Sequence, residues 1–197
     1  MAHLALQPAG FRMSLMKQRI FILVGLAVAA LVLAAAAIAG TVTATATVTG
    51  AGSLALSHGA TATISDTIDG TDQSVNYTVP LTMTDARGTG TGWNLTVTST
   101  TFNTGTRTLA TTASTVASVS SACVAGGTCT NPTNAITYPV TVPAAATAPT
   151  AVKIFNAAAN TGMGRFTVTP SINVAIPGNA YAGAYSSTLT VAAVSGP

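Results

Sequence analysis

The chain has 197 residues, of which 6% are charged and 48% are hydrophobic, whereas roughly 25% of the residues of an ordinary soluble domain are charged. Three of the seven basic residues precede residue 20, and the other four balance the four aspartates. Nucleic-acid binding needs clustered Lys and Arg on one face, so the composition excludes that class. The length allows one or two small domains, and a surface rich in Thr, Ser, Ala and Gly is typical of secreted or wall-attached β-proteins.

The first 39 residues have the pattern of an export signal. Lys17 and Arg19 precede an almost unbroken apolar run at residues 20–39, which ends in Ala37-Ile38-Ala39 before Gly40. A basic segment, an apolar segment and a small-x-small end predict a secretory signal peptide. An uncleaved membrane anchor is the alternative, because about twenty apolar residues just span a bilayer. Both interpretations predict a leader at residues 1–39 that contains an N-terminal apolar helix, followed by an exported domain at residues 40–197.

The two cysteines fit an exported chain. Cys123 and Cys129 enclose Val-Ala-Gly-Gly-Thr, a flexible segment that allows a disulfide to form in an oxidising compartment. A zinc site would need four ligands, and the chain has no second Cys pair or His pair to supply them. We therefore expect a local disulfide in a surface loop.

Strand patterns dominate the chain after residue 40. Residues 41–49 alternate strictly, with Val42, Ala44, Ala46 and Val48 on one face and threonines on the other, as expected of a half-buried strand. Many short strands with frequent turn signals predict an all-β fold, a single β-sandwich of Ig-like or Greek-key type. The Thr/Ala-rich stretch 109–122 is expected at the periphery. The other predicted strands are residues 60–65, 74–84, 93–100, 116–119, 135–142, 152–156, 165–169, 172–176 and 187–194.

The side-chain inventory argues against an enzyme. The chain contains no Glu, and His58 is the one His after the predicted leader. A nucleophilic triad needs a base oriented by a third group, and we expect His58 in an exposed turn instead. Asp66, Asp69 and Asp72 form a weak Ca²⁺ candidate, but their spacing does not match an EF-hand loop. Ordinary turn residues are the favoured interpretation of these aspartates, so no cofactor and no metal is expected.

The most informative segment is residues 84–97, where an Asp and an Arg flank a Gly-rich turn before an alternating strand. One interpretation is a tight hairpin in which Asp85 pairs with Arg87 while Trp93, the chain's one tryptophan, fills the core. Buried tryptophan is a common core residue, which favours that interpretation from composition alone. The other interpretation is an aromatic platform beside polar loop residues, on which sugar rings could stack.

Asp-Ala-Arg-Gly-Thr-Gly-Thr-Gly-Trp-Asn-Leu at residues 85–95 resembles the first signature of the WxL domain, a cell-wall-binding module of Gram-positive surface proteins. The similarity continues at residues 152–157, 161–166, 173–177 and 181–191 and reaches Gly196-Pro197, so that it covers most of residues 64–197. The resemblance implies a secreted β-sandwich attached noncovalently to peptidoglycan, often alongside other surface proteins.

One position departs from the family pattern. The family usually has a second Trp-x-Leu after a Thr-Leu-Thr run, and this chain has Val191-Ala192-Ala193 there. If the second tryptophan contacts the wall polymer, its loss weakens wall binding. If it is a core residue, Val191 leaves a cavity that neighbouring side chains could fill.

These observations predict a non-catalytic module at the cell surface, bound to peptidoglycan or another envelope glycan. The alternative is a structural subunit of a surface fibre or pilus, in which residues 41–49 add as a strand to a neighbouring copy. Pairing of that strand within its own domain is the simpler outcome, because it costs no association entropy. Other surface proteins or copies of the chain are possible partners, and the membrane is one only through an uncleaved leader. The candidate wall-contacting residues are Asp85, Arg87, Trp93, Leu95, Tyr181 and Tyr185.

Overall fold

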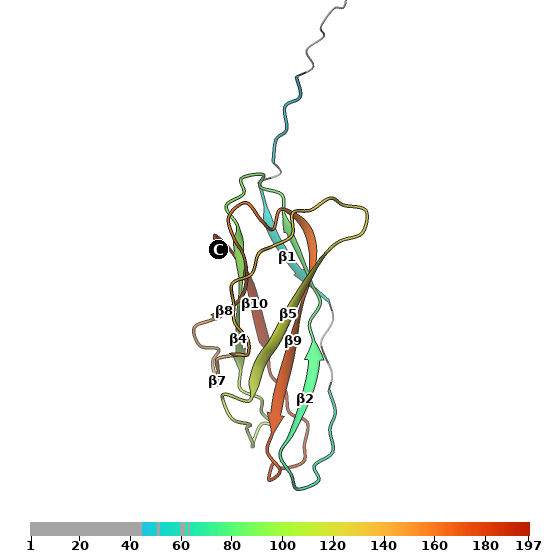
Figure 1. The fold of residues 1–197 in the computed structure, drawn as a ribbon. Helices are drawn as coiled ribbons and strands as arrows, with labels where there is room; N and C mark the ends of the chain where they lie inside the picture. The colour runs from blue at the N-terminus through green and yellow to red at the C-terminus, as the bar shows by residue number, and fades with distance from the viewer. Residues whose placement is uncertain (1–44, 51, 60–61, 63) are drawn as a thin grey trace, which may run out of the picture. The chain divides into compact units, whose positions relative to one another are not determined.

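A computed structural model describes residues 45–50, 52–59, 62 and 64–197. The chain divides into two units after Thr47, and all of the strands lie in the second unit, Val48–Pro197. The described residues form ten strands in two sheets and contain no helix. Figure 1 shows β4, β8 and β10 on one side and β2, β5 and β9 on the other. The expectation of an all-β fold is confirmed.

The larger sheet is built around β9, which is long enough to pair with two strands in succession along one edge. It has the order β1-β3-β9-β5-β6, with β2 also paired to β9, and every pair is antiparallel. Its strands are β1 (Leu54–His58), β2 (Gln73–Thr78), β3 (Leu81–Asp85), β5 (Ser114–Cys123), β6 (Val140–Thr141) and β9 (Gly164–Ile176).

The smaller sheet is built around β4, which pairs antiparallel with β10 along one edge and with β8 along the other. A two-residue strand, β7, extends the β8 side by a parallel pairing with the end of β4. Within the described residues β10 pairs with β4 alone, so β10 forms an edge of this sheet. The strands are β4 (Trp93–Thr100), β7 (Ala144–Ala145), β8 (Val152–Ala157) and β10 (Leu189–Ser195).

Both sheets contribute to one hydrophobic core. Alternate residues of each strand point inward, as the period of two requires. The larger sheet supplies Met83, Phe166 and Val168, and the smaller sheet supplies Trp93 and Leu95, all of them 0% exposed. A second, smaller cluster around Leu109, Ala113 and Val174 lies at the far end of β4 and β9 from Trp93.

Two differences from the predicted strands occur at prolines. The predicted strand 74–84 is two strands, β2 and β3, which are separated at Val79-Pro80. The predicted strands 165–169 and 172–176 are instead one strand, β9, which continues through Pro170. Proline cannot donate a ladder hydrogen bond, and β9 changes partner at this point, from β3 before Pro170 to β2 after it.

The strand 93–100 was predicted correctly, whereas several weaker patterns were not. Described residues 45–49 form no strand, and residues 41–44 lie outside the described residues. Likewise, the described part of 60–65 is not a strand, and β1 precedes it. Of 135–142 only β6 is a strand. The stretch 109–122 is not peripheral throughout, because β5 lies between β9 and β6 and buries Ser114 and Val116.

The N-terminal apolar helix and the leader fall outside the described residues. No helix among the described residues is long and apolar enough to cross a membrane. The Ig-like or Greek-key type of the fold stays a prediction, as does the boundary after residue 39.

Cys123 and Cys129 form the expected disulfide. It closes the loop that follows β5, and this loop packs against the start of β9, where a Cβ on Gly164 would lie 2.9 Å from the Cβ of Cys129. The backbone N–H of Thr130 also donates to the carbonyl of Met163 at 2.9 Å. The bridge therefore braces a loop whose end is already held by the sheet.

Replacing both Cys123 and Cys129 with Ser should lower the free energy of unfolding without changing the fold. A loop this short limits the entropy that the disulfide removes from the unfolded chain, to about 2 kcal/mol. Chemical denaturation of both forms measures the difference. Loss of the native β-sheet circular dichroism in the variant would show that the loop is more than a brace.

Candidate functional site

The signature segment places Asp85 and Arg87 in a tight, mostly buried pair. Asp85 ends β3 and is 4% exposed. Its carboxylate accepts hydrogen bonds from the Arg87 backbone N–H at 3.1 Å, from Nε at 2.9 Å and from Nη2 at 2.8 Å. Hydrogen bonds from the Arg87 side chain hold the pKa of Asp85 below its usual range, and burial opposes them. The pair fixes the turn between β3 and β4.

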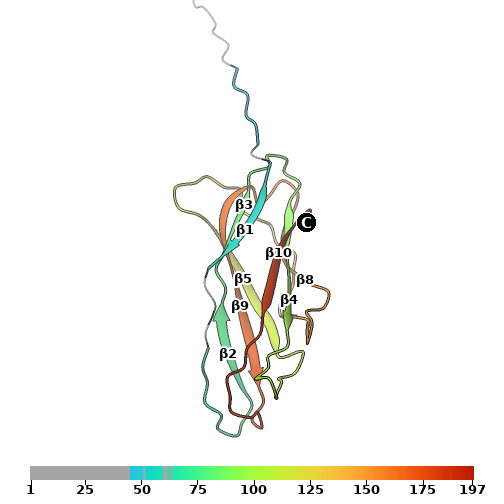
Figure 2. The same ribbon diagram turned by 180° about the vertical axis from the view of Figure 1, so that it is seen from behind.

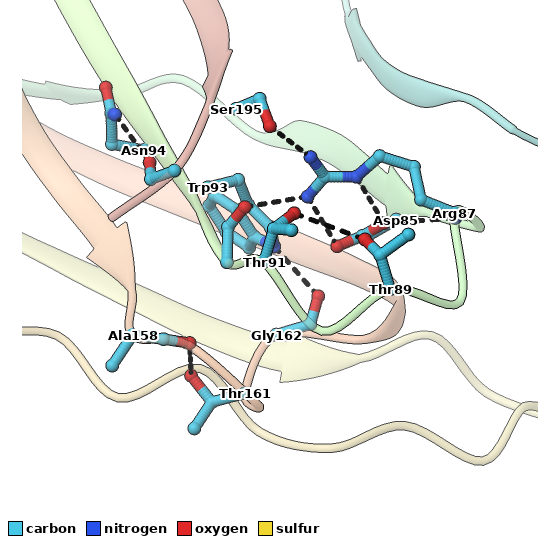
Figure 3. Close-up of polar contacts among 12 residues, drawn as sticks. Asp85, Arg87, Thr89, Thr91, Trp93, Asn94, Ala158, Thr161, Gly162 and Ser195 are labelled. Atoms are coloured by element: carbon cyan, nitrogen blue, oxygen red, sulfur yellow. Dashed lines mark hydrogen bonds and ion pairs between the residues drawn. The ribbon is translucent and has the colours of Figure 1, made fainter.

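Arg87 extends this pairing to the beginning and the end of the smaller sheet. Its Nη2 donates to the carbonyl of Gly92 at 2.7 Å, directly before β4, and its Nη1 donates to the hydroxyl of Ser195, the last residue of β10 (Figure 3). The backbone N–H of Gly196 donates to the same Gly92 carbonyl at 3.1 Å. One guanidinium thus joins a turn, the first residue before β4 and the end of the chain.

Two glycines allow the backbone to pack closely around the Asp85–Arg87 turn and Trp93. Gly92 has φ of 71°, and a Cβ there would collide with the backbone carbonyl of Ala157. Gly162 has φ of 68°, and its Cβ would lie 2.6 Å from Nε1 of Trp93. Both positions combine left-handed backbone with no room for a side chain, which only glycine tolerates without strain.

Trp93 is a core residue and not an exposed platform. Its side chain is 0% exposed, its Nε1 donates to the carbonyl of Gly162 at 2.8 Å, and its ring centroid lies 5.7 Å from Phe155 and 6.4 Å from Phe166. Leu95 is also 0% exposed. Stacking on a sugar requires an accessible ring face, and the buried ring of Trp93 offers none in this conformation.

The two candidate tyrosines lie at the other end of β4. They belong to residues 177–188, which connect β9 to β10, and this connection meets residues 101–113, which follow β4. Two backbone hydrogen bonds between Asn103 and Ser186, of 3.0 and 2.9 Å, join the two connections. Tyr181 is 58% exposed, and the Arg107 guanidinium carbon lies 3.8 Å from the centroid of its ring.

A hollow of about 650 Å³ opens beside these tyrosines. Phe102, Tyr181 and Tyr185 supply aromatic surface to its lining, and Asp66 supplies a carboxylate. The Tyr185 hydroxyl donates to the carbonyl of Tyr181 at 3.0 Å and so fixes the loop that carries both rings. The structure therefore separates the predicted site residues into a buried group (Asp85, Arg87, Trp93 and Leu95) and a surface group (Tyr181 and Tyr185).

Two of the three aspartates of the weak Ca²⁺ candidate make local turn contacts in the structure, and the third bonds to the connection between β9 and β10. Asp66 accepts from the backbone N–H of Thr67 at 2.8 Å, and Asp69 accepts from the backbone N–H and hydroxyl of Thr71 at 2.9 and 2.7 Å. Asp72 accepts from the backbone N–H of Gly178 at 2.9 Å. Over the described part of the chain, no three His, Cys, Asp or Glu side chains are grouped so that they could hold a metal.

Sequence reasoning missed Phe102 and Arg107, which border the surface group. Both occur in a stretch without alternation or a motif, and their proximity to Tyr181 follows from the pairing of Asn103 with Ser186, 83 residues later in the chain. The one available signal was the presence of an aromatic and a basic residue just after a predicted strand, and that signal is weak.

Trp93→Ala should destabilise the domain by about 3–5 kcal/mol, because it empties a large buried site. Trp93→Phe keeps most of the packing but loses the hydrogen bond to Gly162, which is worth about 1 kcal/mol. Denaturant unfolding of both variants tests this order. A Trp93→Ala variant as stable as the wild-type protein would contradict the core assignment.

Asp85→Asn should remove part of the acid sensitivity of the fold. Because the pKa of Asp85 is lowered in the folded state, its contribution to stability is complete above its unfolded pKa near 4 and is lost as the pH falls through the lower folded value. The variant should be less stable at pH 7 by about 3 kcal/mol, because it leaves Arg87 without its charged partner, and its stability should change less between pH 5 and pH 2.

Thermal unfolding across that pH range is the measurement, and Asp66→Asn is the control, because Asp66 makes one hydrogen bond to its neighbour at an exposed turn. Hydrogen bonds from Thr71 also lower the pKa of Asp69, so some acid sensitivity will remain in Asp85→Asn. An unchanged pH profile in Asp85→Asn would contradict the role given to the pair.

Comparison with known families finds one match, which spans most of the chain. The family model described as WxL domain surface cell wall-binding matches residues 38–194. No curated protein and no solved structure matches the chain. The match covers β1 to β9 and all of β10 except its last residue, and it includes the Asp85–Arg87 turn, the buried tryptophan and the tyrosine-bearing connection. The chain belongs to the family of WxL domain surface cell wall-binding proteins.

Proposed function

We propose that this protein is a non-catalytic module that attaches noncovalently to peptidoglycan at the cell surface. The family to which it belongs supports a wall-binding role and a surface location. The observation that carries the finer proposal is Tyr181, a 58% exposed aromatic side chain beside a hollow of about 650 Å³. An exported chain with a cleaved or anchoring leader is part of the same proposal.

The glycan contact is proposed at the surface group and not at the signature turn. Sugar rings present apolar faces and hydroxyl rims, and concave sites with aromatic walls and a few polar groups suit them. Tyr181, Tyr185 and Phe102 supply aromatic surface, and Asp66 and Arg107 supply an acceptor and donors for hydroxyl or amide groups. Arg107 over the ring also restrains the Tyr181 side chain, which reduces the entropy lost on binding.

The buried group contributes to binding indirectly. Asp85, Arg87 and Trp93 hold β4 and β10. The connection that bears Phe102 follows β4, and the connection that bears Tyr181 leads into β10. A loss of wall binding in a Trp93 variant would therefore report on folding. Only variants of exposed residues test the contact itself.

Tyr181→Ala should weaken co-sedimentation with purified cell-wall sacculi by about tenfold or more, as expected when a central aromatic contact is removed. Tyr181→Phe should bind nearly as well as the wild-type protein, because it keeps the ring. The matched control is Val194→Ala, since Val194 is 45% exposed and lies at the opposite end of β10.

Saturable binding that all three variants retain would place the contact elsewhere on the domain. Absence of binding by the wild-type protein itself, under conditions in which thermal unfolding shows it to be folded, would contradict the proposed function.

A further inference from the structure

A second hollow, of about 750 Å³, lies where the edges of the two sheets face each other. We call it the edge groove, and its lining includes Leu56 and His58 at β1, Tyr77 of β2, and Leu189 and Val191 of β10. Figure 2 shows this side of the domain, with β10 facing β1 and β2. The lining is mainly apolar, and the signature turn does not contribute to it. Phe102 and Tyr185 line both this groove and the hollow of the wall-binding proposal, whereas the residues of β1 and β10 line the edge groove and not that hollow.

The smaller sheet presents a free edge to this groove. Among the described residues β10 pairs only with β4, so every second N–H and C=O of its backbone points away from β4. Such an edge is a template for another strand. Seven consecutive residues, 185–191, line the groove, and the last three of them, 189–191, belong to β10. The seven correspond to about 24 Å of extended chain.

Val191 widens the groove. The resemblance to the WxL family leads us to expect a tryptophan at this position, and the chain has a valine whose side chain is partly buried against the core. An indole is much larger than an isopropyl group, so a tryptophan here would occupy space that the valine leaves in the groove. Neighbouring side chains do not close this space, because Val191 lines the groove in the structure.

The chain also carries a strand-like segment that is unpaired where the structure describes it. Residues 41–49 alternate Val42, Ala44, Ala46 and Val48 with threonines. Described residues 45–50 form no strand, and Val48 is 92% exposed. Nine residues extend over about 30 Å, long enough to follow residues 185–191 along the groove. The small side chains of one face suit a shallow apolar groove, and the threonines suit the outer surface.

We propose that the edge groove receives residues 41–49 of a second copy of this protein as an added strand beside β10. The backbone of the segment would supply the missing hydrogen bonds of the edge, and its valines and alanines would enter the groove, as in other strand-addition complexes. This self-association goes beyond wall binding and does not depend on it. Its failure and the failure of sacculus binding are separate results.

The test uses cysteine cross-linking of the full chain in intact cells. Two variants with different epitope tags are co-expressed, Ala46→Cys as the donor and Leu189→Cys as the acceptor, and a short bifunctional thiol reagent is added. A mixed-tag dimer is expected on a non-reducing gel. The matched control replaces Ala46→Cys by Thr47→Cys, which lies on the opposite face of the same segment and should lose the mixed dimer.

Two further variants keep the test decisive. Val191→Trp in the acceptor copy should abolish the mixed dimer by filling the groove. Thermal unfolding of the purified variant then verifies that it is folded, and detection of its epitope tag on intact cells verifies that it is exported. A single chain that carries both Ala46→Cys and Leu189→Cys reports on pairing within one copy. An intramolecular cross-link without mixed dimer would overturn the proposal in favour of the chain's own segment, and no cross-link in any combination would overturn it altogether.

Discussion

The hydrogen bonds between Asp85 and Arg87 are the constraint on which the rest of the domain depends. They fold the turn between β3 and β4, and the same guanidinium reaches Gly92 and Ser195. This geometry sets where β4 begins, so the side chain of its first residue, Trp93, enters the space between the sheets. The indole then meets the Gly162 carbonyl. A mostly buried ion pair is costly unless its hydrogen bonds are satisfied, and here every carboxylate oxygen has a partner.

The family signature therefore describes how the domain is held together more than what it touches. Its residues are buried or engaged in the turn, whereas the exposed aromatic and the edge groove lie in regions of less distinctive sequence. In this chain the framework and the exposed features are therefore formed by different residues. A loss of binding in a variant of a signature residue can therefore result from unfolding, so the stability of that variant has to be measured as well.

Local patterns in the sequence predicted the features that depend on residues close together in the chain. Strict alternation identified β4, and the short Cys spacing identified the disulfide. Pairing over long distances was not predictable: β9 continues through Pro170 because it changes partner there, and residues 45–49 are not a strand in spite of their alternation. For the same reason Trp93 could be assigned to the core or to the surface until the positions of Gly162, Phe155 and Phe166 were known.

The contact of Arg87 with Ser195 spans 108 residues, which has a consequence for the order of folding. A chain made from its N-terminus contains the signature turn long before it contains β10, so the smaller sheet lacks one edge until β10 has emerged. Contacts of such long range are slow to form, and unpaired strand edges favour aggregation in the meantime. Loss of Ser195 would remove its bond to Arg87, so the completion of the smaller sheet by β10 also completes the hydrogen bonds of the signature turn.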